Sequence, residues 1–191
     1  PAAAESSEAT AAPAATASTE PLRLLQQGDE KQYYLIEPAN ADKTLERFRI
    51  VDLTTGENTI PCDVEGCTHD TADCPAVTDE LPSAQPLVLD EDTVVIFSWA
   101  GEVSNITLAD RQCHDRRLLA SIPGTHLELN NGVFTDGQAL YVSGRESSGV
   151  SFYRIQLADG RVDKLGQNQP AAYLVGTMDR ELVYCYTAPS S

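Results

Sequence analysis

The sequence predicts an all-β fold made of β-propeller-like repeats, about three to four blades of four antiparallel strands each. Three observations lead to this prediction. Short segments rich in β-branched, aromatic and aliphatic residues recur along the 191 residues at related positions. Several of them alternate between apolar and polar side chains, which is the period of a half-buried strand. Segments with the longer period of an amphipathic helix are few.

Four segments align as the first part of the repeat. They start at Asp29, Asp90, Asp136 and Asp179, and each runs from an acidic turn residue into strand-forming residues. Their starts are separated by 61, 46 and 43 residues. Such self-similarity at a near-constant period is typical of repeat architectures, in which each repeat is one supersecondary unit.

A second part of the repeat follows at a similar distance. Residues 48–56 (FRIVDLTTG) match residues 152–160 (FYRIQLADG), and residues 104–110 form a degenerate copy. Apolar and polar side chains alternate in both full copies, so one face of each strand is expected to be buried. The glycine that ends each copy fits a tight hairpin turn with a positive φ.

A further strand is expected before each unit, at residues 22–25, 86–89, 132–135 and 173–176. Four strands in roughly 45 residues match a propeller blade. An antiparallel sandwich is the alternative, but it does not require near-identical units at near-constant spacing. A closed propeller takes about four to eight blades. Because only three full units and the start of a fourth are present, we expect a piece of a longer protein, an open sheet or a protomer completed by association.

Composition divides the chain into two parts. Residues 1–20 contain only Pro, Ala, Ser, Thr and Glu, so we expect a disordered tether over 1–21 and a folded domain over 22–188. The tether is similar to the spacer behind a bacterial export or lipoprotein signal, and an ordinary flexible N-terminus is the alternative. The net charge of −16 argues against nucleic acid as a partner. No apolar run approaches the ~20 residues of a membrane span.

An insertion at 61–75 accounts for the longer first spacing. It contains Cys62, Cys67, His69 and Cys74 within thirteen residues. Three thiols and an imidazole on a loop without apolar periodicity fit a small tetrahedral Zn²⁺ site with a structural role. A disulfide among the three cysteines, with one thiol spare, and unpaired loop thiols are the alternatives. The acidic neighbours argue against a catalytic Cys–His pair, which needs a lowered thiol pKa.

The run Cys-Thr-His-Asp at 67–70, followed by Cys74 and Pro75 and placed behind a low-complexity tether, resembles uncharacterised β-propeller-like lipoproteins of gut Firmicutes. The resemblance covers roughly residues 22–187. It implies an extracytoplasmic domain that is secreted or attached to the cell surface through a lipid anchor upstream of this chain. It also implies a non-enzymatic binding or scaffolding role, with no known ligand.

Sequence motifs of the common enzyme classes are absent, including the nucleophile elbow, the phosphate-binding loop and the zinc-protease helix. We therefore expect a binding or scaffolding module for a protein, small-molecule or glycan ligand. The alternative is the propeller part of an extracellular hydrolase acting on glycans or peptides. Trp99 fits a sugar-stacking platform or, more commonly, a packing aromatic. Cys113 and His114 fit a surface loop better than a second metal site.

Overall fold

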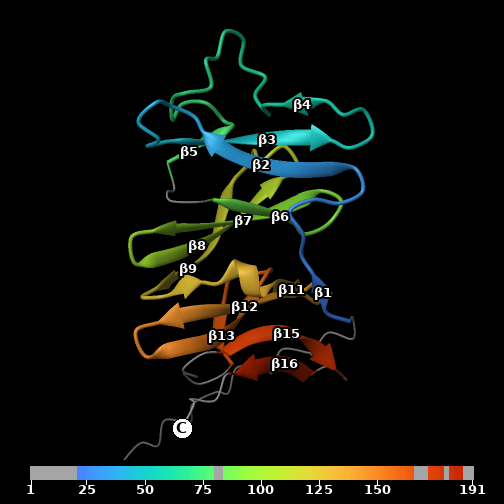
Figure 1. The fold of residues 1–191 in the computed structure, drawn as a ribbon, viewed down its shortest axis with the longest axis vertical. Helices are drawn as coiled ribbons and strands as arrows, with labels where there is room; N and C mark the ends of the chain where they lie inside the picture. The colour runs from blue at the N-terminus through green and yellow to red at the C-terminus, as the bar shows by residue number, and fades with distance from the viewer. Residues whose placement is uncertain (1–20, 80–83, 166–171, 179–180, 187–191) are drawn as a thin grey trace, which may run out of the picture.

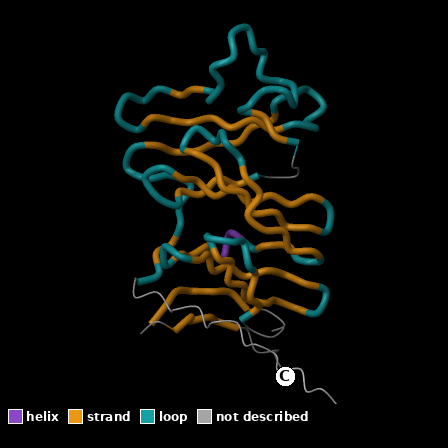
Figure 2. Tube along the Cα trace, turned by 180° about the vertical axis from the view of Figure 1, so that it is seen from behind, coloured by secondary structure: helices purple, strands orange, loops and turns teal. Residues whose placement is uncertain are grey.

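The computed structural model describes residues 21–79, 84–165, 172–178 and 181–186. Their strands form four antiparallel sheets that are stacked in chain order (Figure 1). The described residues contain no α-helix, and one helical turn, η1 (Leu129–Asn131), interrupts the strands (Figure 2). The all-β prediction is confirmed. The described residues form several antiparallel sheets but no closed barrel or ring.

The first two sheets contain the strands between residues 32 and 123. The first sheet has the order β2-β3-β4, with β5 also paired to β3. Its strands are β2 (Gln32–Pro38), β3 (Glu46–Asp52), β4 (Asn58–Thr59) and β5 (Val77–Thr78). The second sheet has four strands in chain order, and they are β6 (Gln85–Val88), β7 (Thr93–Ala100), β8 (Val103–Asp110) and β9 (Arg117–Pro123).

The third and fourth sheets complete the stack. The third sheet has the order β1-β11-β12-β13-β14, with β10 paired to β12. Its strands are β1 (Arg23–Leu24), β10 (His126–Leu127), β11 (Val133–Thr135), β12 (Ala139–Glu146), β13 (Gly149–Gln156) and β14 (Val162–Lys164). The fourth sheet pairs β15 (Ala172–Met178) with β16 (Glu181–Tyr186).

The middle sheets are buried on both faces. In β7, Val95 and Phe97 pack into a core shared with the third sheet, whereas Val94 and Ile96 pack toward the first sheet. This explains the nearly continuous apolar run of β7, because alternate residues of a strand point to opposite faces. Both faces of β7 are therefore covered by neighbouring sheets.

The first sheet ends the stack and is buried on one face only. Phe48 and Ile50 of β3 are buried against the second sheet, as the alternation predicts. Arg47 and Arg49 alternate with them, and both form ion pairs with Glu37, at 2.7 and 3.2 Å. The sequence difference between β3 and β7 therefore reflects their positions at the end and in the middle of the stack.

Three of the four strands expected before the repeat units pair as predicted. β6, β11 and β15 lie next to the second strand of their own units. A strand also forms within residues 22–25, as predicted, but its expected place in the first unit is wrong, because β1 pairs with β11 of the third sheet instead of β2. Leu25 is buried in the core between the second and third sheets. Its burial there explains why this strand joins the third sheet instead of the first.

The segment 23–28, here called the N-terminal belt, crosses the edges of three sheets (Figure 1). Leu25 donates its N–H to the carbonyl of Val133 in the third sheet at 2.7 Å. The carbonyl of Gln26 accepts from Val88 in the second sheet at 2.8 Å. The carbonyl of Gln27 accepts from Tyr34 in the first sheet at 3.0 Å.

The tether predicted at 1–21 falls, except for residue 21, on residues that lie outside the described ones, and so do residues 187 and 188 at the end of the predicted domain. In the part of the chain that the structure describes, no helix is long and apolar enough to cross a membrane.

Two repeat-related glycines provide a matched test of how tightly the sheets stack. Gly56 and Gly160 have φ values of 76° and 73°. A Cβ at Gly56 would have no neighbour within 4 Å, whereas one at Gly160 would lie 1.9 Å from the carbonyl oxygen of Leu119 in the second sheet. We expect Gly56→Ala to lower the free energy of unfolding by about 1–2 kcal/mol, from backbone strain alone. Gly160→Ala should lower it by about 3 kcal/mol or more.

The measurement is urea unfolding of both variants against the wild type. Equal losses for the two variants would contradict the close approach of the second and third sheets at Gly160.

The ion pair between Asp29 and Arg111 predicts a pH dependence of stability. Its N–O distance is 2.6 Å, and it joins the turn before β2 to the turn after β8. Burial acts to raise the pKa of Asp29, but hydrogen bonds from the backbone of Gln32, from Arg111 and from the backbone of Lys31 lower it from 3.8 to about 2. A carboxyl whose folded-state pKa is lowered contributes stability above its unfolded pKa and loses it as the pH falls through the folded value.

We therefore expect Asp29→Asn to destabilise the protein near neutral pH by about 1–2 kcal/mol, after allowance for partial solvent screening. The difference from wild type should shrink as the pH falls from about 4 to about 2. Urea unfolding across this range measures it. Asp115→Asn is the control, because Asp115 is exposed and has a φ of 48°, which Asn adopts readily. A pH-independent difference for Asp29→Asn would contradict the ion-pair account.

Candidate metal centre

The Cys/His loop leaves and rejoins one edge of the first sheet. β4 pairs with the C-terminal half of β3, and β5 pairs with its N-terminal half. Together β4 and β5 occupy the place of one closing strand, and the loop between them projects from the end of the stack (Figure 1). The predicted insertion at 61–75 is therefore a loop that interrupts the closing strand of the first sheet and divides it into β4 and β5.

The four side chains singled out in the sequence converge. The Sγ atoms of Cys62, Cys67 and Cys74 and one ring nitrogen of His69 all lie within 4.8 Å of one another. His69 Nδ1 lies 3.4 Å from Cys74 Sγ. Ligands of a tetrahedral zinc ion with sulfur and nitrogen donors are about 3.5–3.8 Å apart. The cluster can hold a metal ion such as Zn²⁺ after small adjustments.

Turns in the loop backbone bring these side chains together. Gly66 has a φ of 75°, and the N–H of Cys67 donates to the carbonyl of Val64 at 3.2 Å. His69 has a φ of 56°, which is uncommon for a residue other than glycine. A second turn closes with the N–H of Cys74 on the carbonyl of Thr71 at 3.1 Å. A strained backbone at a residue with a ligating side chain is typical of a functional position.

The inner side of the cluster rests on a small apolar core. Cys74 is 3% exposed, and Ala76 and Val77 beside it are also buried. Cys62 and Cys67 are half-buried and pack against the same core. The outer side of the loop carries exposed acidic residues, and they are Asp63, Glu65, Asp70 and Asp73. Their negative charge attracts cations to the site.

The connection between β8 and β9 holds the base of the loop. His114 Nε2 donates to the carbonyl of Pro61 at 2.5 Å. The guanidinium of Arg116 donates to the carbonyls of Pro75 at 2.5 Å and Val77 at 2.9 Å. Its central carbon lies 4.7 Å from the centre of the Phe48 ring. Both ends of the loop are therefore fixed by side chains of the second sheet.

The thiols have different environments. The backbone N–H of His69 lowers the pKa of the Cys67 thiol. Burial raises the pKa of the Cys74 thiol to about 12. A bound divalent cation would favour the thiolate at both positions, because metal-bound thiols are deprotonated. Metal binding at this cluster would therefore release protons.

Other residues considered in the sequence lie outside the cluster. Cys113 is fully buried in the core between the first two sheets, and His114 anchors the loop instead of joining the ligands. Among the described residues none of the five cysteines forms a disulfide. Sequence analysis did not identify Arg116 as an anchor, since an arginine in a turn gives no sign of which distant carbonyls it reaches.

No family model matches the chain, and a search of curated proteins found no match. The resemblance to β-propeller-like lipoproteins therefore stays a prediction that rests on the residues at 67–75.

Arg116 provides a test of how the loop is fixed. Arg116→Met keeps most of the length of the side chain but leaves the carbonyls of Pro75 and Val77 without their charged donor. We expect the free energy of unfolding to fall by about 2–4 kcal/mol, because hydrogen bonds from a charged group to buried acceptors are among the stronger ones. Urea unfolding measures the loss.

Arg117→Met is the matched control. Arg117 is the next residue along the chain and is exposed, so its replacement should change stability by about 0.5 kcal/mol or less. If both variants lost the same stability, the anchoring role assigned to Arg116 would be wrong.

Proposed function

We propose that the chain is a non-catalytic binding or scaffolding module in which Zn²⁺, bound by Cys62, Cys67, His69 and Cys74, holds the projecting loop in place. The convergence of these four donors within 4.8 Å carries the proposal. Three thiolates and an imidazole form a common donor set of structural zinc sites. Sulfur ligands also favour zinc over the hard cations magnesium and calcium.

A metal accounts for more of the cluster than a disulfide does. A disulfide would join two of the three thiols and leave the third, together with His69, without a role. The loop 61–73 has few apolar residues, and Val64 among them is 53% exposed. Such a segment buries too little apolar surface to offset its ordering entropy, and a bound metal supplies the missing stabilisation.

The donor set favours a structural role for the metal. Catalytic zinc sites use three protein ligands and keep one position open for water or substrate, whereas structural sites use four. All four positions here are supplied by the protein. The described carboxyl groups also give little support to the alternative hydrolase, because Glu46 is the one among them whose pKa is raised, and it has no acidic partner in its hydrogen bonds.

The stack of sheets supports a propeller-like architecture for the module. The second sheet has four antiparallel strands in chain order, and successive sheets follow one another face to face (Figure 1). Both features are found in propeller blades. Ligand-binding surfaces on such scaffolds lie in the loops and between neighbouring blades.

The remaining parts of the proposal concern location and partners. We place the module outside the cytoplasm, either secreted or attached through a lipid anchor upstream of this chain. The tether-like composition of residues 1–20 and the resemblance at 67–75 support this location. A protein, small molecule or glycan is the proposed partner. The net charge of −16 argues against nucleic acid.

Native mass spectrometry of the protein purified without reductant tests the metal. We expect one Zn²⁺ for each chain, and we expect Cys67→Ser and Cys74→Ser to lose it, because three ligands bind zinc much more weakly than four. Cys185→Ser is the control and should keep the metal, since Cys185 is exposed and outside the cluster.

Two outcomes would contradict the proposal. A mass lower by two hydrogens without a metal would show a disulfide instead. Hydrolysis of glycosides or peptides at enzyme-like rates would contradict the non-catalytic role.

A further inference from the structure

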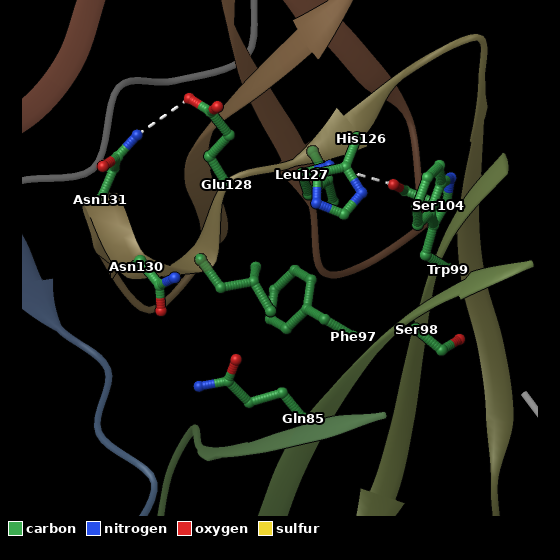
Figure 3. Close-up of a pocket in the computed structure, with 11 residues that line it drawn as sticks. Gln85, Phe97, Ser98, Trp99, Ser104, His126, Leu127, Glu128, Asn130 and Asn131 are labelled. Carbon is green, nitrogen blue, oxygen red and sulfur yellow. Dashed lines mark hydrogen bonds between the residues drawn. The ribbon is translucent and has the colours of Figure 1, made fainter. Parts of the chain in front are cut away.

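A pocket lies where the second and third sheets meet (Figure 3). Its volume is about 290 Å³, which is at the small end of the range for ligand sites, about 300–1,000 Å³. Residues from both sheets line it, including Gln85 of β6, Trp99 of β7 and His126 of β10. The turn η1 closes one side with Asn130 and Asn131.

One wall of the pocket is aromatic. The rings of Trp99 and His126 are in contact, with centroids 4.3 Å apart and planes inclined by 66°. His126 is exposed and Trp99 is half-buried, so neither ring belongs to the packed core. Phe97 also lines the pocket and lies below the His126 ring and above the Gln85 side chain in this view (Figure 3). The packing role considered for Trp99 in the sequence analysis is therefore incomplete, because the side chain also lines the pocket.

The opposite side of the pocket carries side-chain amides. Gln85 and Asn130 make no side-chain hydrogen bond to any described residue. Asn131 uses its amide N–H to donate to Glu128 Oε2 at 2.9 Å, which leaves its carbonyl oxygen as an acceptor. An amide offers both donors and acceptors, as a sugar hydroxyl group requires.

Charge in the pocket is already compensated. Glu128 is its one carboxylate, and Oε1 is held in an ion pair with Arg145 at 2.5 Å while Oε2 accepts from Asn131. An ionic ligand would find no opposite charge free to pair with it, and burying an unpaired charge is costly. The chain as a whole carries −16, which also disfavours anions.

We propose that this pocket binds a neutral sugar unit, such as one residue of a glycan. Aromatic rings at one wall pack against the C–H faces of a pyranose, and the free amides of Gln85 and Asn130 hydrogen-bond its hydroxyl groups. A purely apolar ligand would leave these amides desolvated without partners. The inference rests on the proposed binding role and names the ligand class for it.

The sole tryptophan of the chain makes the test direct. Because Trp99 is the one Trp in 191 residues and lines this pocket, indole fluorescence reports on the pocket alone. Zinc-loaded protein is titrated with glucose, galactose and N-acetylglucosamine, and with the charged sugars glucuronate and glucosamine. We expect a saturable change of emission with at least one neutral sugar and none with the charged ones.

Two substitutions test whether the side-chain amides of Gln85 and Asn130 bind the sugar. Asn130→Ala and Gln85→Ala should each weaken binding about tenfold, the effect of one lost hydrogen bond at the upper end of the usual range. Gln112→Ala is the control, because Gln112 is an exposed amide in the turn after β8, outside the pocket, and its variant should bind as the wild type does.

The inference is overturned if no neutral sugar changes the emission up to its solubility limit. It is also overturned if the Asn130 and Gln85 variants bind as tightly as the wild type. If zinc-loaded protein bound none of the sugars, this inference alone would be contradicted and the metal site would stand. If the protein were purified without zinc and still bound a neutral sugar, the missing zinc would contradict the metal proposal and leave this inference standing.

Discussion

Three consecutive residues near the start of the described chain, Leu25, Gln26 and Gln27, each form a backbone hydrogen bond with a different sheet. This constraint matters because neighbouring sheets share their two largest cores. The second sheet shares one core with the first sheet and another with the third, and β7 supplies side chains to both. Separating neighbouring sheets would expose both sides of a shared core, so the N-terminal belt holds together elements that depend on one another.

The position of the metal cluster follows from the same stacking. The first sheet has a neighbour on one face only, and its other face carries the ion pairs of Glu37 with Arg47 and Arg49. Because no further sheet packs on that face, a loop can leave the edge of β3 here without disturbing the packing between two sheets. Arg116 and His114 then tie its base to the second sheet, so the cluster is joined to the packed part of the molecule through named hydrogen bonds.

Much of this arrangement could be predicted from the sequence because it depends on local patterns. The alternation at Phe48 and Ile50, the hairpin glycines and the position of the insertion are all local, and the structure confirms them. The destination of residues 22–25 could not be predicted, because a short apolar strand fits any sheet edge and its choice depends on the core that Leu25 enters. The pocket residues Gln85 and Asn130 were missed for a related reason. They are far apart in the sequence, and the stacking of two sheets brings them together.

A Zn²⁺ ion coordinated by three sulfurs and one nitrogen is the central claim, and X-ray absorption at the zinc edge of protein purified without reductant tests it most directly. We predict a first shell of three sulfur atoms at about 2.3 Å and one nitrogen at about 2.0–2.1 Å. A shell made up only of oxygen and nitrogen atoms, or protein without zinc, would contradict the claim.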